Sequence, residues 1–186
     1  MMMALVRQRP AAIWLAAPLA WLCAMAPPAG ATQACSLQPV AIQPVTREPA
    51  DAYIGRTAML ELRFHNDKTS GPVDVFPEPP LTVKRLDTQT ECTIEDGGIW
   101  VRRHVYASPD GGTLVTHEYS GSNDELVFYD TRNCTRTATL DVSNTRWTIE
   151  GGAVLKSAAK AGKRPSRIKL DSACVPVKPA APAAQR

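Results

Sequence analysis

The sequence predicts an all-β, antiparallel fold in which three four-stranded units form one compact domain. One recurring segment carries this prediction: an apolar run, an Asp, a Ser or Thr, a short polar turn and a Cys. It occurs as "RLDTQTEC", "FYDTRNC" and "KLDSAC", which end at Cys92, Cys134 and Cys174. Self-similarity at a regular spacing indicates structural units of one kind.

The elements around each copy follow the same order: a Gly, a strand-like run, a polar loop and a second run. Runs with period-two alternation between turn residues are typical of β-hairpins. The first run of the third unit, "AVLKSAAKAG", would also suit a short helix, but its position in the order predicts a strand. Further strand-like runs precede each Gly and follow Cys35, Cys92 and Cys134. The paired runs are "GRTAMLELRFHN" with "LTVKRLDTQTEC", "GGTLVTHEYS" with "ELVFYDTRNC", and "GGAVLKSAAKAG" with "RIKLDSAC".

Both ends of the chain are expected to lie outside the folded domain. Residues 1–31 contain a basic start, an apolar run and the small residues "AGA", the pattern of a cleaved secretory signal peptide. Residues 177–186 are rich in Pro and Ala and are predicted to be a disordered tail. The predicted all-β domain is therefore 32–176. No second long apolar run follows, so we expect a periplasmic or secreted protein that does not span a membrane.

Four cysteines remain after the signal peptide, and export favours two disulfides among them. A zinc site would need close pairs such as C-x-x-C, which the sequence lacks. Three connectivities are open. The run after Cys35 could fill the fourth-strand place that the last unit lacks, and closure of this kind would set Cys35 beside Cys174. That pairing leaves Cys92 with Cys134.

The charge of the chain is unevenly distributed. Acidic residues exceed basic ones from Thr32 to Glu150, and basic residues exceed acidic ones from Gly151 to Arg186. A basic segment can bind nucleic acid, but export and the lack of interleaved aromatic residues argue against it. We interpret the basic segment as a solvated edge that complements the acidic remainder.

One stretch resembles a known repeat. Residues 105–140 contain "SPDG" at Ser108–Gly111 and an apolar strand that ends in Asp130. This stretch resembles a blade of a WD-repeat or related bacterial β-propeller, in which such a turn joins the first two strands. The resemblance implies blade-like units, but propellers typically have at least four blades. A β-trefoil, a small β-barrel and a half-propeller completed by dimerisation are therefore alternatives, and both monomer and dimer stay open.

The sequence points to binding, and it predicts no enzyme, cofactor or metal. It contains no G-x-S-x-G, H-E-x-x-H or P-loop motif. A hairpin folded about "PDGG" would pair His104 with His117, Arg103 with Glu118, and Tyr106 with Val115. Two imidazoles could share a metal ion, but a site needs three or four ligands, so a metal-assisted hydrolase is the least favoured alternative.

The loop from Tyr119 to Asp124 is the leading candidate for a binding site, because it is polar and follows a strand with His117. The long loop Asp67–Pro80 is the second candidate, with Phe76 as an apolar contact. The predicted function is binding of a protein or an envelope glycan. The alternative is a periplasmic inhibitor or immunity protein against a wall-degrading enzyme. The predicted ligand-binding residues are His104, His117, Tyr119, Ser120, Ser122, Asn123 and Asp124.

Overall fold

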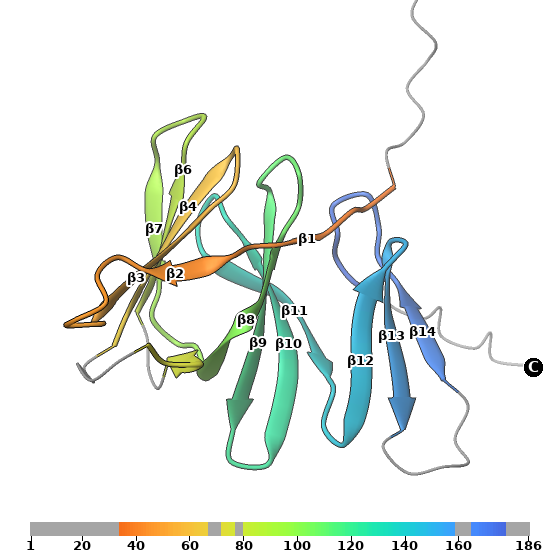
Figure 1. Cartoon of the computed structure of the whole chain (residues 1–186). Coiled ribbons are helices and arrows are strands. Elements are labelled where there is room, and N and C mark those ends of the chain that lie inside the picture. Colours follow the sequence, from red (N-terminus) through yellow and green to blue (C-terminus); the bar gives the residue numbers. More distant parts are fainter. Residues whose placement is uncertain (1–33, 67–71, 77–79, 159–164, 178–186) are drawn as a thin grey trace, which may run out of the picture. The chain divides into compact units, whose positions relative to one another are not determined.

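The structure, a computed structural model, describes residues 34–66, 72–76, 80–158 and 165–177. The regular elements in these ranges are β-strands. The fourteen strands in these ranges form three antiparallel sheets, and the same ranges contain no helix. Figure 1 shows the sheets as three groups of strands. The all-β antiparallel prediction is therefore confirmed.

The two terminal segments are outside this description. The predicted signal peptide, 1–31, is not among the described residues, and of the predicted tail only Val177 is described. All described residues belong to one compact unit, Thr32–Arg186. Within the described ranges, no residue lies in a helix long and apolar enough to cross a membrane.

The first sheet contains the strands of the first predicted unit. Its order is β2-β3-β4-β6-β7. Tyr53 of β3 lies directly opposite Phe64 of β4, and both side chains are buried. Every second residue faces the core here, because successive side chains of a strand point to opposite faces. The strands are β2 (Ile42–Pro44), β3 (Ala52–Arg56), β4 (Leu60–His65), β6 (Leu81–Arg85) and β7 (Glu91–Ile94).

The middle sheet is covered on both faces at its centre. Val127 and Tyr129 of β10 join the core cluster shared with the first sheet, whereas Leu126 and Phe128 join a second cluster shared with the third sheet. Such two-sided burial explains why this strand is a continuous apolar run. The order is β1-β8-β9-β10-β11, with β5 also on β8. The strands are β1 (Gln38–Pro39), β5 (Val75–Phe76), β8 (Ile99–Ala107), β9 (Thr113–Ser120), β10 (Asn123–Asp130) and β11 (Thr135–Asp141).

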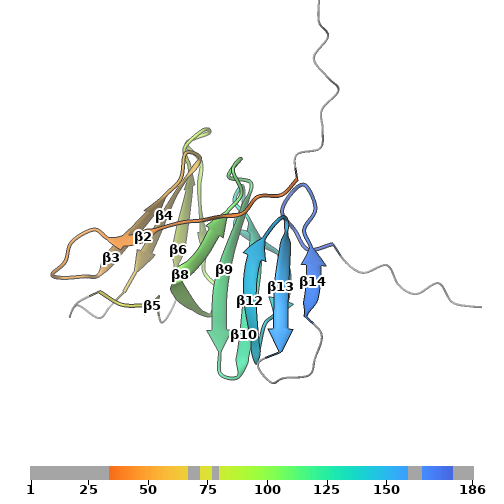
Figure 2. The same cartoon turned by 45° about the vertical axis from the view of Figure 1, so that its right-hand side comes forward.

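The third sheet is the smallest and is packed on one face. Trp147 and Ile149 of β12 pack against the second core cluster, and Arg146, Thr148 and Glu150 between and beside them are exposed. The run "AVLKSA" forms a strand, as its position in the order predicted. Figure 2, turned by 45°, shows its strands side by side. They are β12 (Thr145–Glu150), β13 (Ala153–Ala158) and β14 (Ser166–Lys169).

The predicted count of four strands in each unit differs from the structure, in which the described strands form sheets of five, six and three. The run after Cys35 does not complete the last unit, because β1 pairs with β8 of the middle sheet, Gln38 opposite Ala107. Leu37 before β1 and Val40 after it are buried in different core clusters. Burial of these two side chains draws the segment across the middle sheet (Figure 1).

The recurring Asp segments form turns. Asp130 accepts hydrogen bonds from the backbone N–H of Arg132 at its side chain (2.9 Å) and from that of Cys134 at its carbonyl (2.8 Å). Asp171 accepts the backbone N–H of Ala173 (2.9 Å) and that of Cys174 (3.0 Å) in the same way. Asp favours turns because its carboxylate can bond the backbone two residues on. These carboxylates therefore serve the fold.

Two disulfides link segments that lie far apart in the sequence. Cys92 of β7 is bonded to Cys134, in the turn between β10 and β11. Cys35, just before β1, is bonded to Cys174, in the turn after β14. This pairing is the one that the closure argument favoured. Disulfides form and persist in oxidising compartments.

Candidate functional site

The β8–β9 hairpin has the predicted register only near its turn. Tyr106 lies opposite Val115, as expected, but further along Trp100 lies opposite Glu118. A bulge between Trp100 and Val105 separates the two registers, so the predicted Arg103–Glu118 pair is wrong. Trp100 is fully buried and meets the Phe64 ring edge-on, with centroids 5.6 Å apart. The bulge is the consequence of placing this large ring in the core.

Glu118 is a buried hydrogen-bond acceptor instead of an exposed partner of Arg103. Its Oε2 accepts the backbone N–H of Gly98 (2.8 Å). Its Oε1 accepts the hydroxyls of Thr116 (2.5 Å) and Tyr129 (2.8 Å). Burial, reinforced by the Glu118 charge, raises the pKa of the Tyr129 phenol, which therefore stays a donor. This network fixes the part of β9 that carries His117 and Tyr119.

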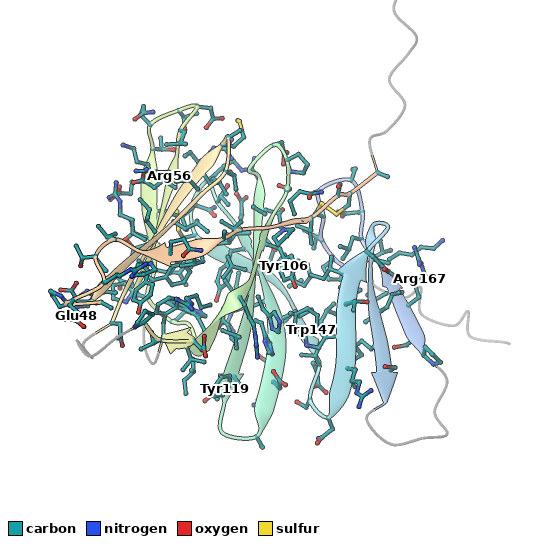
Figure 3. All side chains as sticks on the ribbon, in the orientation of Figure 1. Glu48, Arg56, Tyr106, Tyr119, Trp147 and Arg167 are labelled. Atoms are coloured by element: carbon teal, nitrogen blue, oxygen red, sulfur yellow. A yellow bond between two sulfur atoms is a disulfide. The ribbon has the colours of Figure 1, made fainter. Side chains whose placement is uncertain are left out.

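His104 and His117 meet despite the bulge. Their Nδ1 atoms are 3.0 Å apart, within hydrogen-bond distance. Nε2 of His117 also bonds Oδ1 of Asp124 on β10. The Trp147 ring of β12 lies against both imidazoles, with centroids 5.0 and 5.1 Å away (Figure 3). Burial, then the neighbouring charges of His117 and Arg103, lowers the pKa of His104.

The tip of the β9–β10 hairpin is a tight and well-anchored turn. Ser120 lies opposite Asn123, which leaves Gly121 and Ser122 as a two-residue turn. Gly121 has φ of 60°, and Gly at this first central position is the mark of a type II′ turn. The next residue, Asp124, donates its backbone N–H to the hydroxyl of Ser143 (3.0 Å). The candidate loop is thus held by its own tight turn and by the hydrogen bond to Ser143.

An open hollow with a volume of about 480 Å³ lies between this hairpin and the β11–β12 turn. Six of the seven predicted ligand-binding residues line it, and Ser120 does not. Of the other lining residues, Gly121 and Val75 belong to the two predicted loops, and sequence reasoning missed the rest. One signal could have found two of them: β9, β10 and β11 run up and down in turn, so the chain leaves β11 at the same end of the sheet as the β9–β10 turn. The predicted lining residues are His104, His117, Tyr119, Ser122, Asn123 and Asp124; the missed ones are Val101, Arg103, Ser143 and Asn144.

The second candidate loop, Asp67–Pro80, contributes in part. Residues 67–71 and 77–79 are outside the described ranges. Within the described part, Val75 lines the hollow, and β5 pairs with β8. Phe76, predicted as a contact residue, is fully buried and stacked on Phe64, with centroids 4.6 Å apart. Phe76 therefore anchors the loop to the core.

Metal ligands do not gather at the histidines. Over the residues that the structure describes, no group of three or more His, Cys, Asp or Glu side chains could hold a metal ion. The two facing Nδ1 atoms bond each other, which occupies the positions that a shared ion would need. That the protein holds no metal stays a prediction.

These features define a class: a disulfide-linked, all-β protein with a polar hollow on a rigid hairpin. A family model described as "Immune protein Tsi1" matches residues 35–179. The protein named "Immune protein Tsi1" from Pseudomonas aeruginosa (strain PAO1) is 35% identical over 145 residues, which cover 77% of this chain and 81% of that protein. The chain belongs to the Tsi1 immune protein family. It is a non-catalytic protein, as the sequence predicted.

The family match corrects the resemblance to a propeller blade. The model covers residues 35–179 as a whole, whereas the resemblance was confined to 105–140 and is wrong as an assignment. That stretch forms the end of β8, all of β9 and β10, and β11 up to Leu140. The "SPDG" segment is a β-turn in which the N–H of Gly111 bonds the carbonyl of Ser108 (2.9 Å). Such a turn suits any hairpin of this length, so it does not distinguish a propeller.

Proposed function

We propose that this chain is an exported immunity protein that binds a protein toxin in the periplasm and blocks its action. From the sequence this function is the alternative to binding of a protein or an envelope glycan, and membership of an immune protein family favours it. The signal-peptide pattern of residues 1–31 and the two disulfides support export to an oxidising compartment. The toxin class that we favour is a wall-degrading enzyme, because its substrate lies in that compartment.

The observation that carries the proposal is the hollow beside the β9–β10 tip. Ser122 and Asn123 are exposed at this tip and carry hydrogen-bonding groups. The turn behind them is tight, and Asp124 is bonded to both His117 and Ser143. A preorganised loop loses little conformational entropy when it binds, which favours tight complexes.

The chain would act by occupying the active site of the toxin. A narrow hairpin tip fits a concave active site, and its side chains would satisfy polar groups there that substrate otherwise contacts. Tyr119, at the edge of the hollow, supplies an aromatic contact of the kind enriched at the energetic centre of interfaces (Figure 3). No residue of the hollow needs to react.

A growth competition tests this function. Recipient cells lacking the chain are challenged by the parental strain and complemented with the full chain, the chain without residues 1–31, or Ser122→Trp. Only the full chain should restore survival, because protection requires export and an unobstructed tip. Ser172→Trp, the same substitution in the exposed turn after β14, is the matched control and should protect fully.

Two outcomes would contradict the proposal. Equal survival of the deleted and complemented recipients would refute an immunity function. Full protection by folded Ser122→Trp would keep the function but exclude the hairpin tip as the contact.

A further inference from the structure

Hydrogen-bond direction at the bottom of the hollow is fixed by three residues in series. Asp124 on β10, His117 on β9 and His104 on β8 form a chain of two hydrogen bonds. Each link constrains the next, because a neutral imidazole has one N–H donor and one acceptor nitrogen. The chain therefore determines what His104 presents to a partner.

The direction follows from the carboxylate. An ionised Asp124 only accepts, so Nε2 of His117 carries the proton of their hydrogen bond. In neutral His117 the other nitrogen, Nδ1, is then an acceptor. Nδ1 of His104, 3.0 Å away, must donate to it. The remaining nitrogen of His104, Nε2, is left with a lone pair.

That last nitrogen is accessible to a partner. Nε2 of His104 makes no hydrogen bond within the described part of the chain, and it is not among the buried polar atoms there. The His104 ring lines the hollow. On its other side the ring contacts Trp147, which has no group that titrates. The titratable or charged groups near His104 are His117, Arg103 and Asp124, from three different strands.

We infer that Asp124, acting through His117, fixes Nε2 of His104 as a hydrogen-bond acceptor for a donor group of the partner protein. A hydroxyl, an amide N–H or an ammonium group would satisfy it. This inference rests on the proposed function for the partner, but the acceptor itself is a property of the free protein. His104 is the contact residue, and His117 and Asp124 are positioning residues.

One proton reverses the arrangement without moving a ring. A proton taken up from solvent at Nε2 of His104 leaves that ring with two N–H groups. Nε2 of His104 is now a donor. A partner donor and this proton compete for the same lone pair, so acid should weaken binding.

Nitrogen-15 NMR of the histidine rings tests the acceptor directly in the free protein. At pH 7.5 we expect Nδ1 of His104 to be protonated and Nε2 to be unprotonated. Asp124→Ala removes the acceptor that fixes His117, and it should leave both rings as mixed tautomers. His65, on β4 of the first sheet, is the internal control, and its signals should not change.

Two results would overturn the inference. A protonated Nε2 on His104 at pH 7.5 would show that the hollow presents a donor. Unchanged His104 tautomers in folded Asp124→Ala would show that the chain does not control them.

The partner's half of the inference has its own test in the competition assay. His104→Gln retains an acceptor oxygen and should protect recipients, whereas His104→Leu should weaken protection, with affinity about threefold to tenfold lower for one lost hydrogen bond. Full protection by His104→Leu, together with loss of protection by Ser122→Trp, would refute the contact at His104 while leaving the proposed function in place.

Discussion

Single residues explain most of what the sequence could not predict. The strand pattern of β9 does not reveal that Glu118 is buried, yet its side chain lies in the interior and accepts three hydrogen bonds. Its donors come from positions that a strand pattern does not bring together, among them Gly98 and Tyr129. The sequence predicted the contact of His104 with His117, but not its extension to Asp124. Only the two-residue turn at Gly121–Ser122 brings Asp124 back beside His117.

Replacement of Glu118 by Ala should destabilise the protein by about 3 kcal/mol. The change leaves buried donors unsatisfied, and each costs about 1–3 kcal/mol. Tyr129→Phe removes one of these donors and should cost about 1 kcal/mol. Urea unfolding measures both free energies. Glu150→Ala, an exposed Glu of β12, is the control, and a Glu118 variant as stable as this control would refute the network.

Acid should destabilise the protein through His104 before its carboxylates are protonated. Burial lowers the native pKa of His104 below its ordinary value of 6.5. The unfolded chain therefore binds more protons, and stability that is fully present above pH 6.5 falls as the pH drops below it. Asp110 and Asp130 have lowered pKa values because Ser108 and Arg132 donate to them, and their contribution is lost only as the pH falls below 3.8.

The measurement is urea unfolding at pH 7.5 and pH 5. His104→Gln should lose less stability between these two pH values than the natural protein does. Equal losses in the two proteins would contradict the assignment of this effect to His104.

At the scale of elements, the alternation of side chains was enough to predict strands, but not to predict their partners. The sequence indicated the β8–β9 hairpin and its register at the turn, because "SPDG" is a local signal. It could not indicate the bulge, because the core that receives Trp100 is built by Phe64 and other residues of the first sheet. Likewise β1 and β5 join the middle sheet through contacts distant in sequence.

Two turn glycines provide a matched test of how the sheets pack. Gly111 and Gly121 both have positive φ, 67° and 60°. A Cβ on Gly111 would lie 2.6 Å from Cβ of Met59, whereas a Cβ on Gly121 would have nothing within 4 Å. Gly121→Ala should cost about 1 kcal/mol from backbone strain alone. Gly111→Ala should cost more, by about 1–3 kcal/mol, in thermal or urea unfolding. Equal costs would show that Met59 does not pack against this turn.

At the scale of the whole molecule, the two disulfides connect segments that no shared sheet joins. Cys92–Cys134 links the first sheet to the middle one, and Cys35–Cys174 links the segment before β1 to the turn after β14. The cysteines were the long-range signal that the sequence did contain. The family was not evident from any motif, because the turns that carry the likeness to other folds are common to β-hairpins.

Reduction of the disulfides should lower stability substantially. Each typically contributes about 2–4 kcal/mol, in large part by restricting the unfolded chain. Unfolding followed with and without reductant measures the difference, and a thiol reagent should not react with the native, unreduced protein. Rapid reaction of that protein at any of the four cysteines would contradict the pairing.

The central claim is that the β9–β10 tip binds a protein. Its most direct test places a photo-crosslinking amino acid at position 122 of the exported chain and, in a control, at position 172. Recipient cells are challenged by the parental strain and irradiated, and adducts are identified by mass spectrometry. We predict one adduct with a protein delivered by the challenging strain, formed from position 122 and not from position 172. No such adduct from position 122 in a protected recipient, or the same adduct from position 172 alone, would contradict the account.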